Sequence, residues 1–113
     1  MTNIYYLDLK YGRDKRATGY ILDISRGGMS IACSHKVGKD TKIEIITHKK
    51  ILLPMKGRVV AASPRHRKTY KFRLGVGFTS LTGKQKQGLE KFMSRIERRH
   101  AVRLVLINLW KQD

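Results

Sequence analysis

The chain has 113 residues, and its 25 lysines and arginines outnumber its 8 aspartates and glutamates to give a formal net charge of +17. This length accommodates one domain and excludes most multi-domain enzymes. Hydrophobic residues make up 41% of the chain, and their regular spacing excludes a disordered basic tail. The charge predicts an anionic partner, which can be a nucleic acid, a nucleotide or an acidic membrane surface.

Few signals bear on compartment and targeting. Cys33 is the single cysteine, so no intrachain disulfide forms, as is typical of a protein in a reducing cytoplasm. Residues 1–10 lack the pattern of a signal peptide. The most apolar stretch, residues 104–109, is too short to span a bilayer. We therefore expect a soluble cytoplasmic protein without a transmembrane segment.

The first part of the chain has the pattern of short strands. Runs of β-forming residues predict strands over residues 4–9, 17–24 and 29–33, separated by a charged, glycine-bearing turn and by a Ser-Arg-Gly-Gly turn. The third run alternates large and small residues, which places Cys33 in the core.

The next part adds three further strands. They are predicted over residues 42–47, 51–62 and 70–78, with a bend near Pro54 in the middle one and an exposed hairpin tip at residues 65–68. Six short strands with close turn signals predict a mainly β domain, either a small antiparallel barrel or a sandwich.

The pattern changes to that of a helix at Thr82. Thr82 and Gln85 have the spacing of a capping box, which predicts a helix that buries one apolar stripe against the strands. Residues 1–98 are expected to form this domain. Residues 99–113 form a basic and apolar extension that either continues the helix or adds a strand. The expected stripe consists of Leu89, Phe92, Met93 and Ile96.

Arrangements typical of enzymes are lacking. The histidines share no metal-ligand spacing with one another or with Cys33. Ser25 stands in a glycine-rich turn, but without the flanking glycines of a hydrolase nucleophile elbow. We therefore predict neither catalysis nor a cofactor or metal.

One informative segment runs from Asp23 to Gly28. Asp23 and Ser25 are two residues apart at the end of a strand, so their side chains are expected on one face, and the glycines after them allow a close approach by a ligand. A carboxylate accepts well from the N–H edge of guanine, and a hydroxyl both donates and accepts. The alternative is an ordinary hairpin turn, in which the same residue types are common.

A second informative segment contains Arg98, Arg99 and Arg103. Arg99 and Arg103 are four residues apart, so they share a face of a helix or clamp a ligand from an extended arm. Guanidinium groups match phosphate oxygens and the O6/N7 edge of guanine. The alternative is a solvated helix end, where basic residues complement the helix dipole.

Together the two segments resemble the PilZ domain, the bacterial receptor module for cyclic di-GMP. That family carries an RxxxR motif and a [D/N]xSxxG motif around a six-stranded antiparallel β-barrel closed by a C-terminal helix. Residues 23–28 fit the second motif in full, and Met29-Ser30-Ile31 and Gly75-Val76-Gly77-Phe78 look like its flanking strands. The resemblance covers roughly residues 4–96.

The position of the arginines departs from the family. RxxxR lies upstream of the first strand in PilZ domains, whereas here Arg99 and Arg103 follow the helix. Three explanations are open. The motif is relocated and folds back to the same pocket, or it begins a second domain or completes a neighbouring molecule's site. In the third, the helix simply continues and the domain is degenerate, with weak or no nucleotide binding. We favour a relocated, functional motif.

The resemblance implies a sensor or adaptor that binds cyclic di-GMP and changes its conformation or partner surface. Arg99 and Arg103, with Arg98 beside them, would hold phosphates and guanine edges. Asp23 and Ser25 would hold another guanine edge, Gly28 would leave room for the base, and Arg26 would stack on it.

Two other functions remain open. One is a degenerate, ligand-free adaptor that pairs with its own copy or another protein through Leu104 to Trp110, because such an apolar segment seldom stays solvated. The other is a general basic barrel that binds nucleic acid. The positive charge beyond the motif arginines predicts an additional acidic partner.

Overall fold

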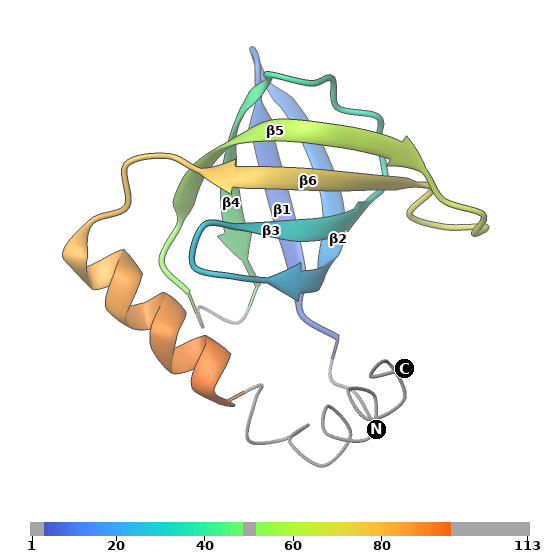
Figure 1. The fold of residues 1–113 in the computed structure, drawn as a ribbon. Helices are drawn as coiled ribbons and strands as arrows, with labels where there is room; N and C mark the ends of the chain where they lie inside the picture. Colours follow the sequence, from blue (N-terminus) through green and yellow to red (C-terminus); the bar gives the residue numbers. More distant parts are fainter. Residues whose placement is uncertain (1–3, 49–51, 96–113) are drawn as a thin grey trace, which may run out of the picture.

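Alternation of large apolar residues with polar ones builds a barrel of six strands, seen in a computed structural model that describes residues 4–48 and 52–95 (Figure 1). Fully buried side chains come from different strands and belong to one core inside the barrel, as Leu7, Ile31 and Leu74 do. The strands are β1 (Tyr6–Tyr11), β2 (Lys15–Ile24), β3 (Gly28–Cys33), β4 (Lys42–Thr47), β5 (Met55–Pro64) and β6 (Phe72–Phe78).

The sheet closes on itself in the order β1-β2-β3-β6-β5-β4, with every neighbouring pair antiparallel. The prediction of a mainly β, six-stranded antiparallel barrel followed by a helix is confirmed, and the sandwich is excluded. Cys33 is fully buried, as its alternation pattern predicts.

Some strand boundaries differ from the predicted ones. The strand expected over residues 51–62 begins only at Met55 and continues to Pro64. Pro54 has no N–H to donate to a neighbouring strand. Leu52, before it, is bonded to the Thr47 hydroxyl instead: its backbone N–H donates to Thr47 Oγ1 at 3.3 Å, and its carbonyl accepts from the same hydroxyl at 3.2 Å. The strand expected from residue 70 begins at Phe72, because Tyr70 has φ of 50° and belongs to the hairpin.

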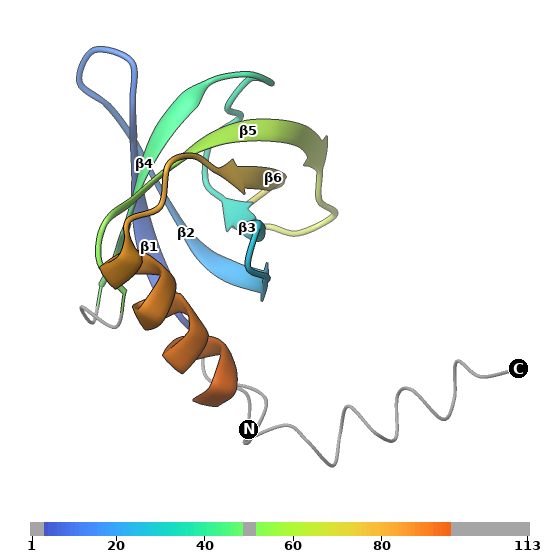
Figure 2. The ribbon, with the colours of Figure 1, turned by 60° about the vertical axis from the view of Figure 1, so that its left-hand side comes forward.

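A helix over residues 83–95 follows β6 and packs beside the barrel end where β1 begins (Figures 1 and 2). The predicted capping box is confirmed: the Thr82 N–H donates to Gln85 Oε1 at 2.7 Å, and the Gln85 N–H donates to Thr82 Oγ1 at 3.2 Å. Leu89 and Phe92 are buried in the core, as the stripe predicts. Ile96 and the extension 99–113 lie outside the described residues.

Within the described ranges, no helix is both long enough and apolar enough to cross a bilayer.

Candidate functional site

A tight turn between β2 and β3 presents the Asp23–Gly28 motif. The Ser25 N–H donates to the Gly28 carbonyl at 2.8 Å, and Ser25 Oγ lies 3.3 Å from the same oxygen. The Phe78 N–H donates to the Gly27 carbonyl at 2.9 Å, which ties the turn to the end of β6. The motif is thus held on the barrel by backbone hydrogen bonds at both of its sides.

A bulge in β2 turns the Asp23 carboxylate to the outside of the barrel. Ile21 pairs with Ile31, but the next pair is Asp23 with Ser30, so Leu22 is an extra residue. If β2 continued without this bulge, side chains would alternate regularly after Ile21, and Asp23 would point inward and Ile24 outward. The bulge instead lets Ile24 pack against the core and leaves Asp23 exposed.

Asp23, Ser25 and Gly28 border one open depression of about 260 Å³ on the outer wall. No large side chain rises from its floor, because Gly28 pairs with Gly77 and the small Ser30 pairs with Gly75 across β3 and β6. The structure therefore brings these three motif residues together. The full lining is Asp23, Ile24, Ser25, Gly28, Met29, Ser30, Val60, Gly75 and Val76.

Val60 forms an apolar wall of the depression. It is the extra residue of a second bulge, since Val59 pairs with Val76 and Ala61 with Gly75. Its side chain is 53% exposed, and its two methyl groups lie 3.6 Å from the positions that a Cβ would take at Gly75 and Gly77. A flat ring on the glycine surface would contact this wall.

Arg26 of the motif and Arg73 of β6 have different partners. Arg26 does not line the depression; its Nε lies 3.5 Å from Glu90 Oε1 on the helix, with both side chains largely exposed. Arg73 of β6 lies at the edge of the depression, where its Nε donates to Ser30 Oγ at 2.9 Å. The sequence interpretation missed Arg73, Ser30 and Val60, although the alternation around the buried Leu74 already places Arg73 on the outer face.

Arg98, Arg99 and Arg103 lie outside the described residues, and the structure therefore neither joins them to the depression nor separates them from it.

Gly28 has a role in the barrel besides any role toward a ligand. A Cβ at this position would run into the carbonyl oxygen of Val76, because β3 and β6 approach closely here. The glycine is therefore required by the packing of two backbones, which no side-chain movement can relieve.

The Cys33 thiol is suited to packing rather than to chemistry. Burial raises the pKa of the Cys33 thiol above its usual value, and backbone hydrogen bonds near His35 and Ser34 lower it by less. A buried thiol held in its neutral form is a poor nucleophile.

Comparisons with known proteins agree with this geometry. The sequence profile described as "PilZ domain" matches residues 7–95. The fold is similar to the PilZ domain, with c-di-GMP, of YcgR from Escherichia coli: the TM-score is 0.66, the sequence identity is 15%, and the match covers 89% of this chain and 87% of that one. No curated protein sequence gives a significant match. Since the profile spans all six strands and the helix to residue 95, this chain belongs to the PilZ domain family.

Proposed function

We propose that this chain binds cyclic di-GMP at the depression on β2, β3 and β6 and acts as a sensor or adaptor rather than as an enzyme. The observation that carries the proposal is the shared position of Asp23, Ser25 and Gly28, which line one open site with the carboxylate turned outward. Their order in the sequence is that of the [D/N]xSxxG motif.

The side chains fit the edge and face of a guanine. The Asp23 carboxylate accepts from the N1–H and the amino group of the base, and the hydroxyls of Ser25 and Ser30 both donate and accept. The low glycine surface leaves room for the ring, and Val60 gives it an apolar contact.

The size of the depression fits one base and not the whole dinucleotide. Its volume of about 260 Å³ is below the ~300–1,000 Å³ that is typical of pockets that enclose a small molecule. The second guanine and the phosphates must therefore lie over the surrounding surface. Arg73 is well positioned to meet a phosphate there, because its bond to Ser30 directs the guanidinium toward the rim.

The remaining contacts are assigned to the extension. Arg99 and Arg103, with Arg98, supply the phosphate and guanine contacts of a relocated RxxxR motif. Arg26 exchanges its exposed contact with Glu90 for stacking on a base that extends beyond the depression. Residues 1–98 then form the barrel and helix, and residues 99–113 form an arm. In this proposal the arm lies away from the barrel without the ligand and against it with the ligand. The ligand binds the second position more tightly, so binding changes the surface offered to a partner.

The cellular setting follows from the same proposal. The protein works in the bacterial cytoplasm, where the second messenger is produced. Leu104 to Trp110 pair with a second copy or with another protein.

Isothermal titration with cyclic di-GMP, beside GTP, tests the site. We expect saturable binding of cyclic di-GMP and a loss of about tenfold or more in affinity for Asp23→Ala and for Arg99→Ala, because each removes charge-assisted hydrogen bonds worth about 1.5–3 kcal/mol. Asp14→Asn is the matched control: it makes the same charge change in the β1–β2 turn, at φ of 56°, which asparagine adopts readily.

Two results would contradict the proposal. One is a folded wild-type protein that takes up no cyclic di-GMP, which would leave a ligand-free adaptor. The other is an equal effect of Asp23→Ala and Asp14→Asn, which would mean that only net charge matters.

A further inference from the structure

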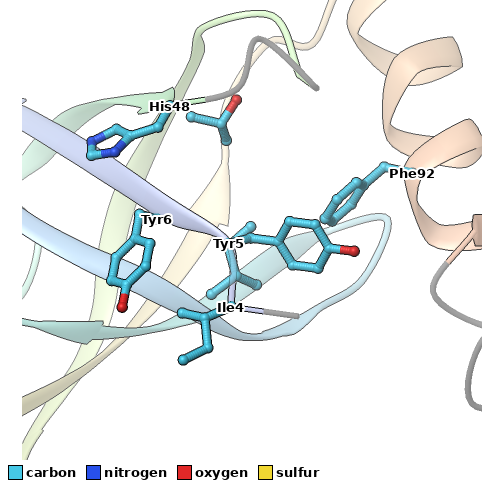
Figure 3. A pocket seen from close by; sticks show the side chains of 7 residues that line it. Ile4, Tyr5, Tyr6, His48 and Phe92 are labelled. Carbon is cyan, nitrogen blue, oxygen red and sulfur yellow. The ribbon is translucent and has the colours of Figure 1, made fainter. Parts of the chain in front are cut away.

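Four rings form a row on the outside of the barrel, which runs from the β5–β6 hairpin across β2 and β1 to the residue after β4. We call Tyr70, Tyr20, Tyr6 and His48 the aromatic row. Ring centroids are 5.2 Å apart for Tyr70 and Tyr20, 6.1 Å for Tyr20 and Tyr6, and 6.4 Å for Tyr6 and His48. In Figure 3, Tyr6 and His48 lie on the same side, while Tyr5 turns away toward Phe92 of the helix.

Strand register produces this row. Leu7 and Leu9 point into the core. Side chains alternate along a strand, so Tyr6, which precedes Leu7, points to the outside. Tyr6 pairs with Tyr20 across β1 and β2, and the His48 N–H donates to the Tyr6 carbonyl at 3.1 Å. Tyr6 remains 42% exposed despite both ring contacts, so its ring is accessible from solvent.

The β5–β6 hairpin is fixed against the row by Arg65. Its Nη1 donates to the Tyr70 carbonyl at 2.9 Å and its Nη2 to the Tyr20 hydroxyl at 3.2 Å, with the guanidinium carbon 5.7 Å from the centre of the Tyr20 ring. Tyr70 has φ of 50°, a left-handed conformation that is unfavourable for a bulky residue. The hairpin is thus held beside the rings at a conformational cost.

The same hairpin is strongly cationic. Residues 65–71 contain four lysines and arginines and no acid. Arg67, Lys68 and Lys71 are exposed, whereas Arg65 is occupied by the two tyrosines. Asp8 lies at the other end of the row from the hairpin, with a carboxylate oxygen 3.1 Å from His48 Nε2. Positive charge therefore borders the exposed rings.

We propose that the aromatic row and the β5–β6 hairpin form a binding site for single-stranded nucleic acid, separate from the dinucleotide depression. Bases stack on the exposed ring of Tyr6 and on the part of the half-buried Tyr20 ring that Arg65 leaves open, and phosphates contact the cations of the hairpin. Proteins that bind single strands combine rings for stacking with cations that follow the backbone. An acidic protein would need the cations but not a row of rings in which Tyr6 and His48 are exposed, so the rings favour bases.

A nucleic-acid site also accounts for positive charge that cyclic di-GMP binding does not need. A cyclic dinucleotide carries two phosphates, whereas the chain has a net charge of +17. A polyanion engages many cations at once and gains affinity from the counterions that it releases.

Fluorescence anisotropy with labelled oligothymidylate and oligouridylate of about 10 nucleotides tests the rings on the full chain. We expect binding that weakens about tenfold in Tyr6→Leu and stays near wild type in Tyr6→Phe, because only the second variant keeps a ring for stacking. A comparison of the two oligonucleotides tells whether DNA or RNA is preferred.

A pair of double variants tests the hairpin. Arg67→Gln/Lys68→Gln removes two cations beside the row, and Lys84→Gln/Lys86→Gln removes two exposed cations at the start of the helix, well apart from the hairpin in both ribbon views (Figures 1 and 2). The net charge changes equally. We expect the hairpin variant to reduce the slope of log affinity against log salt by about 1.4, and the helix variant to leave the slope unchanged.

Equal effects of the two double variants, or equal affinities of Tyr6→Leu and Tyr6→Phe, would overturn the site. A change of oligomeric state in Tyr6→Leu at unchanged oligonucleotide affinity would overturn it in favour of a self-interface. The two proposals fail separately, because Asp23→Ala is expected to leave oligonucleotide binding intact and Tyr6→Leu to leave cyclic di-GMP binding intact.

Discussion

Neighbouring glycines in the β2–β3 turn differ in what a side chain would meet. A Cβ at Gly28 would run into the backbone oxygen of Val76, while a Cβ at Gly27 would have no atom within 4 Å. We expect Gly28→Ala to lower the free energy of unfolding by about 1–3 kcal/mol, as for other overpacked sites. Gly27→Ala should leave it within about 0.5 kcal/mol.

Urea unfolding followed by circular dichroism measures both variants. Equal stabilities would mean that β3 and β6 can separate without cost. The comparison also decides how a ligand-binding defect of Gly28→Ala is interpreted, since a destabilised barrel weakens the site without any loss of a ligand contact.

At the scale of elements, the helix depends on its first turn. Thr82 and Gln85 satisfy each other's backbone N–H groups, and Gln85 Nε2 also donates to the Pro54 carbonyl at 2.7 Å. We expect Thr82→Ala to lower the free energy of unfolding by about 1 kcal/mol. Gln85→Ala should cost more, because it also removes the bond to the segment before β5.

Gln87→Ala is the control on the exposed face of the same helix. Urea titration of the three variants checks the order. A Thr82→Ala variant as stable as Gln87→Ala would show that burial of Leu89 and Phe92 positions the helix without help from the cap.

The six strands, apart from some of their ends, and the start of the helix were predictable because they depend on local patterns, whereas the order of the strands in the closed sheet was not predicted. Alternation placed Cys33 in the core, and the Thr82–Gln85 spacing located the helix. The two bulges were not predictable, because an extra residue such as Leu22 or Val60 is defined only by the partner strand. The bond from Arg73 to Ser30 joins residues 43 positions apart and depends on the pairing of β3 with β6.

In the candidate sites too, what depends on local sequence was predictable and what depends on strand pairing was not. The motif predicted that Asp23, Ser25 and Gly28 act together, and one depression contains all three. It did not predict the aromatic row, because Tyr6, Tyr20 and Tyr70 come from three separate segments whose register only the closed sheet determines.

At the scale of the whole molecule, positive charge covers several walls of the barrel. A hollow of about 620 Å³ over β1, β4 and β5 is bordered by Lys10, Lys42, Lys56 and Arg58, with Glu44 among them. A net charge of +17 on one small domain must repel itself. Salt shortens the range of that repulsion, to about 10 Å at 0.1 M.

We therefore expect the free energy of unfolding to rise, on the order of 1 kcal/mol, as sodium chloride is raised from low to moderate concentration. Urea titrations at each salt concentration measure it. Arg67→Gln/Lys68→Gln should respond less than the wild type, because part of the repulsion is already gone. A stability that is flat or falls with salt would contradict the expectation.

The closure of the barrel determines how any partner can recognise this protein. Each of the six described strands has a neighbour on both sides, so none presents an open edge along its whole length. A partner therefore finds no full-length edge among these six to which it could add a strand of its own, and copies of the barrel find none through which to stack edge to edge. Recognition must read side chains on the walls and loops, and these can be replaced one at a time while the hydrogen-bonded cylinder beneath them stays the same.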